Sequence, residues 1–134
     1  MSPEIEAGLR LFYAAILGAM IGFQRERYNK PAGLRTHILI CMGAALFTVV
    51  SVLGFSGTVD PSRVAAGIVT GIGFIGAGVI FRGIKGDKVV GITTAASVWI
   101  TAAIGIAAGV GMYIIAGAVT IITFIVLMLP RVKG

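Results

Sequence analysis

The segment Gly71-Ile-Gly-Phe-Ile-Gly76 has the spacing of the G-x-G-x-x-G fingerprint that binds dinucleotides. That chemistry needs a strand before the glycines, a helix after them and an acidic residue about 20 positions further on. Here the motif lies inside the uncharged stretch from Val64 to Phe81, and no acidic residue follows Asp87. The glycines are therefore interpreted as helix-packing residues, and no nucleotide cofactor is expected.

The ionisable side chains provide no other catalytic or metal-binding set. The sequence has one histidine, His37, and one cysteine, Cys41, so a transition-metal site lacks ligands. The acids Glu26, Asp60 and Asp87 stand at the ends of apolar segments. Cation paths through a membrane usually need ionisable groups at membrane depth. We therefore expect no enzyme activity, no catalytic residues, no metal centre and no cofactor.

A group of charged and polar residues after the first apolar segment is the predicted functional patch: Arg25, Glu26, Arg27, Arg35, Thr36 and His37. The alternative role for its basic residues is topology and lipid anchoring. Glu26 separates the two interpretations, because an acid adds nothing to anchoring at an anionic membrane face. Its expected partner is Arg35, Arg82 or a donor on another protein.

Three charges lie at the opposite ends of the apolar segments: Arg10, Asp60 and Arg63. Asp60 suits the N-cap of a helix whose first residue is Pro61. A charge drawn unpaired into lipid is costly. We therefore also expect Asp60 to pair with Arg10 or Arg63.

Polar side chains recur along the segment 89–108. Thr94, Ser97 and Thr101 share one helix face with Thr93 beside them, and Trp99 points away. In one interpretation the stripe lines a pore or ligand site. In the other, which is favoured, it makes hydrogen bonds between helices.

These residues are positioned by five apolar segments, 7–23, 36–55, 64–81, 89–108 and 112–129. Hydrophobic residues make up 57% of the 134 residues and charged residues 12%, which is typical of an integral membrane protein. Nine Lys or Arg residues follow odd-numbered segments and two lie on the other side, which places the N-terminus outside. The prediction is an all-α bundle of about five transmembrane helices, a single domain over residues 1–134. Its basic residues sit in loops beside the lipid bilayer, so no nucleic acid is expected.

The segment 64–81 is predicted to lie at the centre of this bundle. It carries five glycines: Gly67, Gly71, Gly73, Gly76 and Gly78. The first two and Gly78 fall on one helix face, and the others fall on the opposite side. Small residues let helix backbones approach closely, and the Gly67-x-x-x-Gly71 spacing is typical of such crossings. We expect this face to contact neighbouring segments or a second copy, with a homodimer favoured.

The sequence also repeats at an offset of 58 residues. Gly18-Ala19 aligns with Gly76-Ala77, and Gly33 aligns with Gly91. The match relates the first two apolar segments to the third and fourth in the same orientation, as in some transporters. Coincidence in a chain rich in glycine and alanine is the alternative.

Several motifs together resemble the membrane domain of the MgtC/SapB family. They are Gly18-Ala-Met-Ile-Gly-Phe-Gln-Arg-Glu-Arg27, Lys30-Pro-Ala-Gly-Leu-Arg-Thr-His37, Asp60-Pro61, Gly71-Ile-Gly-Phe-Ile-Gly-Ala-Gly78 and Gly91-Ile-Thr-Thr-Ala-Ala96. The resemblance implies a multi-pass protein of the bacterial inner membrane, linked to growth at low Mg²⁺. It also implies that the protein modulates partner membrane proteins, with the F-type ATP synthase as the partner in one branch. The alternative is a transporter or channel for Mg²⁺ or another small solute.

The sequence departs from the family pattern in two places. Gln24 stands where the family often has an acidic residue, which weakens a cation-site interpretation. Longer members continue into a cytoplasmic C-terminal regulatory domain, whereas this sequence ends four residues after Pro130.

Overall fold

The computed structural model describes residues 2–55, 57, 59–82 and 89–130. Within these residues the chain forms five helices: α1 (Pro3–Arg27), α2 (Leu34–Leu53), α3 (Ser62–Val79), α4 (Ile92–Gly109) and α5 (Tyr113–Leu127). The first four are long and apolar enough to cross a membrane, and α5 is shorter, with 15 residues. The predicted all-α, polytopic membrane fold is confirmed.

The predicted third and fourth segments differ from the helices at their facing ends. Phe81–Arg82 form strand β1, which pairs antiparallel with strand β2 (Val89–Val90). Gly91 then adopts a φ of +93°, a left-handed conformation that glycine tolerates and that a right-handed helix interior does not contain. Helix α3 therefore ends at Val79, and α4 begins at Ile92 rather than at residue 89.

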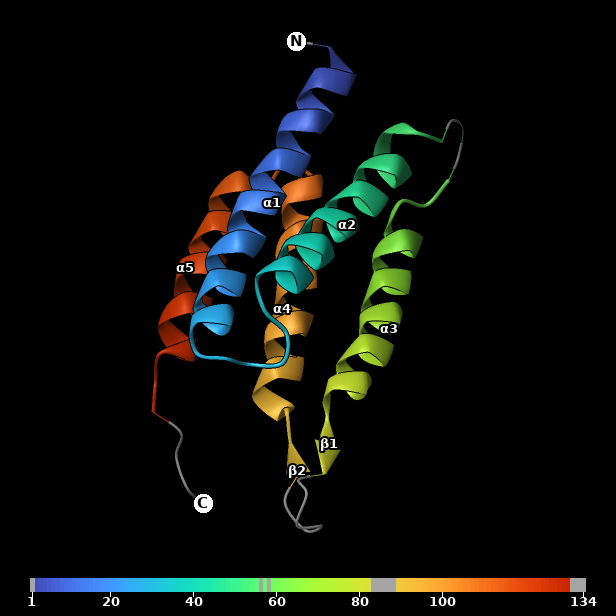
Figure 1. Ribbon diagram of the computed structural model, residues 1–134. Coiled ribbons are helices and arrows are strands. Elements are labelled where there is room, and N and C mark those ends of the chain that lie inside the picture. Colours follow the sequence, from blue (N-terminus) through green and yellow to red (C-terminus); the bar gives the residue numbers. More distant parts are fainter. Residues whose placement is uncertain (1, 56, 58, 83–88, 131–134) are drawn as a thin grey trace.

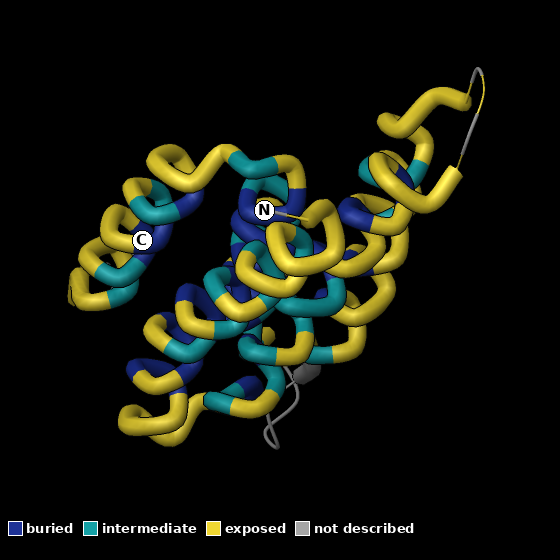
Figure 2. Tube along the Cα trace, turned by 90° about the horizontal axis from the view of Figure 1, so that it is seen from above, coloured by how far each residue is buried: buried dark blue, intermediate teal, exposed yellow. Residues whose placement is uncertain are grey.

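The centre of the bundle is α4, which packs against α1, α2, α3 and α5. Nine of its residues are buried, whereas α3 buries Ile72 and Gly76 alone among its residues. Helix α3 lies at the edge of the bundle (Figure 1), and buried residues gather where the other helices face one another (Figure 2). The prediction that segment 64–81 is central is therefore wrong. The reason is that apolar character alone does not say which faces meet protein and which meet lipid.

Glycine allows the closest contacts between the packed helices. A Cβ built on Gly18 of α1 would lie 2.5 Å from the carbonyl oxygen of His37 in α2. A Cβ on Gly105 of α4 would collide with the Cys41 carbonyl oxygen, again in α2. Both positions need a residue without a side chain, so α1 and α4 hold α2 between them at short range.

The two helical hairpins α1–α2 and α3–α4 correspond at the offset of the sequence repeat in the start of their second helices and in their contacting glycines, although α3 packs less closely on α4 than α1 does on α2. Helices α2 and α4 begin 58 residues apart, each directly after a glycine. The nearest neighbour of Gly18 is in His37, and the neighbour of Gly76 is Ala95, which are the corresponding residues of the two hairpins. Helix α5 stands outside this repeat.

Candidate functional site

The predicted functional patch separates in the structure into an interior pair and a surface group. Arg25, in the last turn of α1, is 5% exposed, and His37, in the first turns of α2, is 0% exposed. Thr36 is half-buried. The exposed members are Glu26, Arg27 and Arg35. The six residues therefore do not form one surface.

Arg25 reaches from α1 to the first turn of α4. Its Nη2 donates to Thr94 Oγ1 at 2.7 Å, while its buried Nε has no partner among the described residues. The N-terminal end of α4 carries a partial positive charge and has no side-chain cap. The one ion pair within the described residues involves another arginine, and Asp87 lies outside them. The buried guanidinium thus faces the partial positive charge of a helix end, and its Nε–H has no acceptor among the described residues. Both features favour an anionic acceptor at this position.

His37 ties α2 to α4. Its Nδ1 lies 2.8 Å from the Gly33 carbonyl oxygen, and since a carbonyl only accepts, Nδ1 is the donor. Its Nε2 then faces Ser97 Oγ at 3.0 Å. The same hydroxyl lies 2.8 Å from the Thr94 carbonyl oxygen. The hydroxyl has one proton, so it donates to either the imidazole Nε2 or the Thr94 carbonyl oxygen at any one time, and through Ser97 the imidazole contacts α4, the helix that Arg25 bonds.

The polar stripe of α4 is thus part of this interior cluster. Thr94 and Ser97 make hydrogen bonds to α1 and α2, which is the interhelical role given above as one of the two interpretations of the stripe. Thr101 is buried and donates to the Ser97 carbonyl oxygen of its own helix at 2.6 Å. Thr93 is exposed. We define the interior cluster as Arg25, His37, Thr94 and Ser97.

Glu26 has a backbone partner. Its Oε1 accepts from the N–H of Leu34 at 3.0 Å, at the start of α2. The N-cap residue, Gly33, has no side chain, so the first N–H groups of α2 need an acceptor from elsewhere. Among the described residues Glu26 makes no ion pair with Arg35. The other two expected partners stay predictions, because the side chain of Arg82 lies outside the described side chains and a donor on another protein is not tested.

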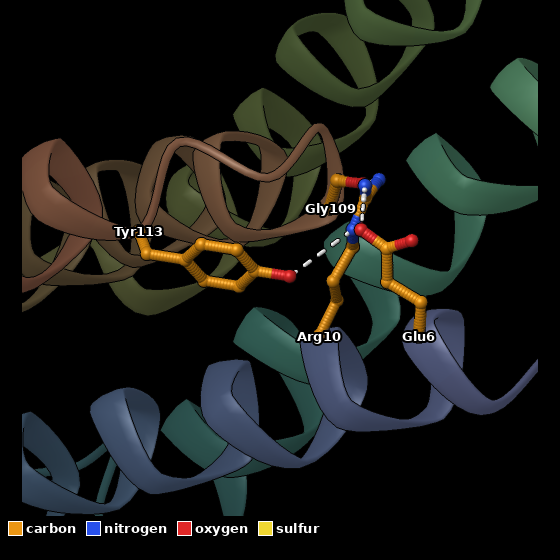
Figure 3. Close-up of polar contacts among 4 residues, drawn as sticks. All are labelled: Glu6, Arg10, Gly109 and Tyr113. Carbon is orange, nitrogen blue, oxygen red and sulfur yellow. Dashed lines mark hydrogen bonds and ion pairs between the residues drawn. The ribbon is translucent and has the colours of Figure 1, made fainter. Parts of the chain in front are cut away.

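The opposite end of the bundle holds a second polar cluster, around Arg10 (Figure 3). Arg10 donates to the Gly109 carbonyl oxygen at 2.9 Å and to Tyr113 Oη at 3.3 Å. It forms an ion pair with Glu6 Oε1 at 2.9 Å. The expected pairing of Arg10 with Asp60 is wrong, because the acid one helical turn earlier satisfies the guanidinium.

Asp60 acts at the start of α3. Its Oδ1 accepts from the N–H of Ser62 at 2.9 Å and from Ser62 Oγ at 2.7 Å. These bonds favour the ionised carboxylate and lower the pKa of Asp60, with the charge of Arg63 a lesser cause. Pro61 is the N-cap residue, so Asp60 lies one position earlier than predicted. Arg63 is exposed and makes no ion pair within the described residues.

Sequence reasoning missed the polar contacts that fasten α5 to α1. Tyr13 Oη donates to the Tyr113 carbonyl oxygen at 2.8 Å, and the two tyrosine rings meet edge to face. Gln24 Nε2 donates to the Phe124 carbonyl oxygen at 3.2 Å. The available signal was that Arg10, Tyr13 and Gln24 share one face of α1.

The predicted packing glycines of α3 have little to pack against within the chain. A Cβ on Gly76 would lie 3.8 Å from Ala95. The other four have no neighbouring atom within 4 Å of such a Cβ: Gly67, Gly71, Gly73 and Gly78. Over the described part of the chain, no group of three His, Cys, Asp or Glu residues is placed to hold a metal ion.

The sequence profile of the MgtC family matches residues 11–133. The chain is 48% identical over 126 residues to "Putative magnesium transporter YhiD" of Escherichia coli (strain K12), covering 89% of the chain and 58% of that protein. It is 47% identical over 118 residues to "Protein MgtC" of Brucella abortus (strain 2308), covering 88% of the chain and 48% of that protein.

A third relative, "Protein MgtC" of Salmonella typhimurium (strain LT2), is 46% identical over 114 residues, with 85% of the chain and 48% of that protein covered. The chain thus spans about half the length of the curated relatives it matches. No solved structure matches it.

Proposed function

Since the chain belongs to the MgtC family of bacterial membrane proteins, we propose that it is a non-enzymatic regulator that acts on partner membrane proteins of the inner membrane during growth at low Mg²⁺. The link to magnesium is supported by the name of the Escherichia coli relative, a putative magnesium transporter. The first partner to test is the F-type ATP synthase, which the family resemblance suggests.

The observation that carries the proposal is the buried Arg25. A cation that moved between α1 and α4 at this end would pass the guanidinium that bonds Thr94. Two unit charges 4 Å apart near a protein surface interact by about 4 kcal/mol, and a divalent ion doubles this repulsion. The interior cluster therefore disfavours passage of Mg²⁺ between α1 and α4, which supports a regulator over a cation path.

The alternative function is a transporter or channel for Mg²⁺ or another small solute. Its specific support is the pair of equivalent hairpins in the same orientation, because parallel repeats occur in secondary transporters. In such proteins the substrate binds near the interface between the repeats, and here α2 and α4 meet at that interface.

Flux measurements separate the two functions. The purified chain is placed in liposomes that contain a Mg²⁺-sensitive dye. The regulator proposal expects no flux above protein-free liposomes, and saturable flux would support the transporter instead.

A growth assay at low Mg²⁺ tests the role of Arg25. We expect Arg25→Gln to lose activity at a normal membrane level, while Arg35→Gln, at an exposed position, serves as the matched control and keeps it. Glu26→Gln retains an oxygen that can accept from the N–H of Leu34 but removes the negative charge. A loss of growth activity in this variant would therefore assign a function to that charge. Affinity purification with the ATP synthase as the tested partner should lose signal with Arg25→Gln. Full activity and full partner recovery in Arg25→Gln would refute the proposal.

A further inference from the structure

An apolar groove of about 660 Å³ runs between α2 and α3. Its lining includes Gly43 and Phe47 from α2 and Ile68, Gly71 and Ile75 from α3. On the other side of the molecule, α5 covers α1 and α4 (Figure 1). The two sides therefore differ in that one pair of helices is covered and the other is open.

The repeat makes this groove the counterpart of the surface that α5 covers. Helix α5 lies against α1 and α4. In the repeat, α3 is the counterpart of α1 and α2 is the counterpart of α4. Helix α5 covers the surface between α1 and α4, so the corresponding surface lies between α3 and α2. The groove occupies that surface.

Individual residues support this correspondence. Arg10 and Tyr13 of α1 hydrogen-bond to α5, and Leu17 shares a core cluster with Ala116 of α5. At the offset of 58 residues, their counterparts in α3 are Ile68, Gly71 and Ile75. All three counterparts line the groove. The groove thus has the position of a helix-binding surface, and within the described residues no helix of the chain covers it.

We propose that a second copy of the chain fills this groove with its own α3, and that the two copies do so reciprocally about a twofold axis along the membrane normal. A twofold interface uses the same face of both copies, so that face must carry both ridges and hollows. The ridges are Leu39 and Phe47, each 63% exposed. The hollows are Gly43, Gly67 and Gly71, where nothing lies within 4 Å of a Cβ.

The glycines explain why a helix rather than lipid fits here. Lipid chains are as apolar as the helices, so helices associate in a bilayer through close packing of their backbones. Tyr13 approaches Gly117 of α5 on the covered side, with its Oη 2.7 Å from a Cβ built there. Its counterpart on the open side is Gly71, which removes that side chain and lets a second backbone come closer. This inference concerns assembly and does not depend on the proposed regulatory function.

Disulfide cross-linking in membranes tests the interface. The native cysteine is buried, so the background variant is Cys41→Ala. We expect Gly71→Cys and Gly67→Cys each to give, on oxidation, a covalent dimer of twice the chain's 13.8 kDa, because the α3 helices of the two copies cross at these positions. Ile122→Cys, on the exposed side of α5, is the control and should give none. An equal yield at Ile122, or no dimer at either glycine, overturns the proposal, and so does a product that joins the chain to a different protein.

A packing variant tests the same face without a cysteine. Gly71→Leu should convert the dimer to a monomer by light scattering and leave helix content and thermal stability unchanged, because the site is open within the chain. Gly73 is equally open but lies on the opposite side of α3, so the Gly73→Leu variant should remain a dimer. An unchanged mass in Gly71→Leu means that lipid fills the groove and refutes the interface.

Discussion

Replacing Gly18 with alanine should weaken the contact between α1 and α2, whereas the same change at the equivalent Gly76 should stabilise α3. A Cβ on Gly18 would lie 2.5 Å from the His37 carbonyl oxygen and 2.8 Å from Cys41 Cβ. A Cβ on Gly76 would find its nearest atom, in Ala95, at 3.8 Å, which is ordinary van der Waals contact. The two positions are equivalent in the repeat, so each serves as the control for the other.

The expected difference follows from two terms. Alanine in place of glycine favours a helix by about 1 kcal/mol, and this gain applies at both positions. Overpacking costs about 1–3 kcal/mol, and Gly18 should lie at the upper end because a backbone carbonyl cannot rotate away. The net effect is a loss of about 2 kcal/mol for Gly18→Ala and a gain of about 1 kcal/mol for Gly76→Ala.

Thermal unfolding in detergent measures this difference. For a chain of this size, a change of 1 kcal/mol in the free energy of unfolding shifts Tm by roughly 4 °C, so the Tm values of the two variants should differ by about 12 °C. The order matters more than the size, since detergent alters the absolute Tm of both variants alike. A Gly18→Ala protein as stable as Gly76→Ala would show that α1 and α2 are not in the close contact described, and the packing argument would fail.

Two further predictions concern the ends of the helices. The hydrogen bonds to Ser62 lower the pKa of Asp60, so the stabilisation that the carboxylate gives to the start of α3 is complete above the ordinary pKa of 3.8 and is lost as the pH falls through the lowered pKa. Hydrogen exchange at the Ser62 amide should therefore rise in strong acid, and at neutral pH Asp60→Ala should raise this exchange more than Asp60→Asn. Equal exchange in the two variants and the unchanged protein would contradict the assignment. The positive-inside rule predicts that a cysteine at Lys30 is labelled by an impermeant reagent only from the cytoplasm and one at Val59 only from outside, and the reverse pattern would invert the topology.

The helices themselves could be predicted because hydropathy is local. Four of the five helices are long and apolar enough to span a bilayer. The ends of the apolar segments are marked by charge, glycine or proline. The break at Gly91 was missed because nothing in Val89-Val90-Gly91 distinguishes a short strand and a left-handed residue from the start of an apolar helix. The central position of α4 was missed because, in lipid, buried and exposed helix faces are equally apolar.

The interior cluster could be predicted in parts but not as a whole. Arg25 and His37 were assigned to one patch, and Thr94 and Ser97 to another, because sequence spacing relates residues of a single helix. The hydrogen bonds that join them cross 69 and 60 residues. Such pairings depend on how helices are placed against one another, and a single sequence contains no direct record of that placement.

The contacts of Arg10 have a consequence for the way the chain is made. Its partners Gly109 and Tyr113 follow it by 99 and 103 residues. At a synthesis rate of about 5–20 residues per second, the arginine emerges roughly 5–20 s before them. During that interval, of the three partners in Figure 3, only Glu6 has already been made. The acid one turn away therefore accompanies the charge during insertion, and the last residue of α4 and the first residue of α5 then supply the remaining two acceptors.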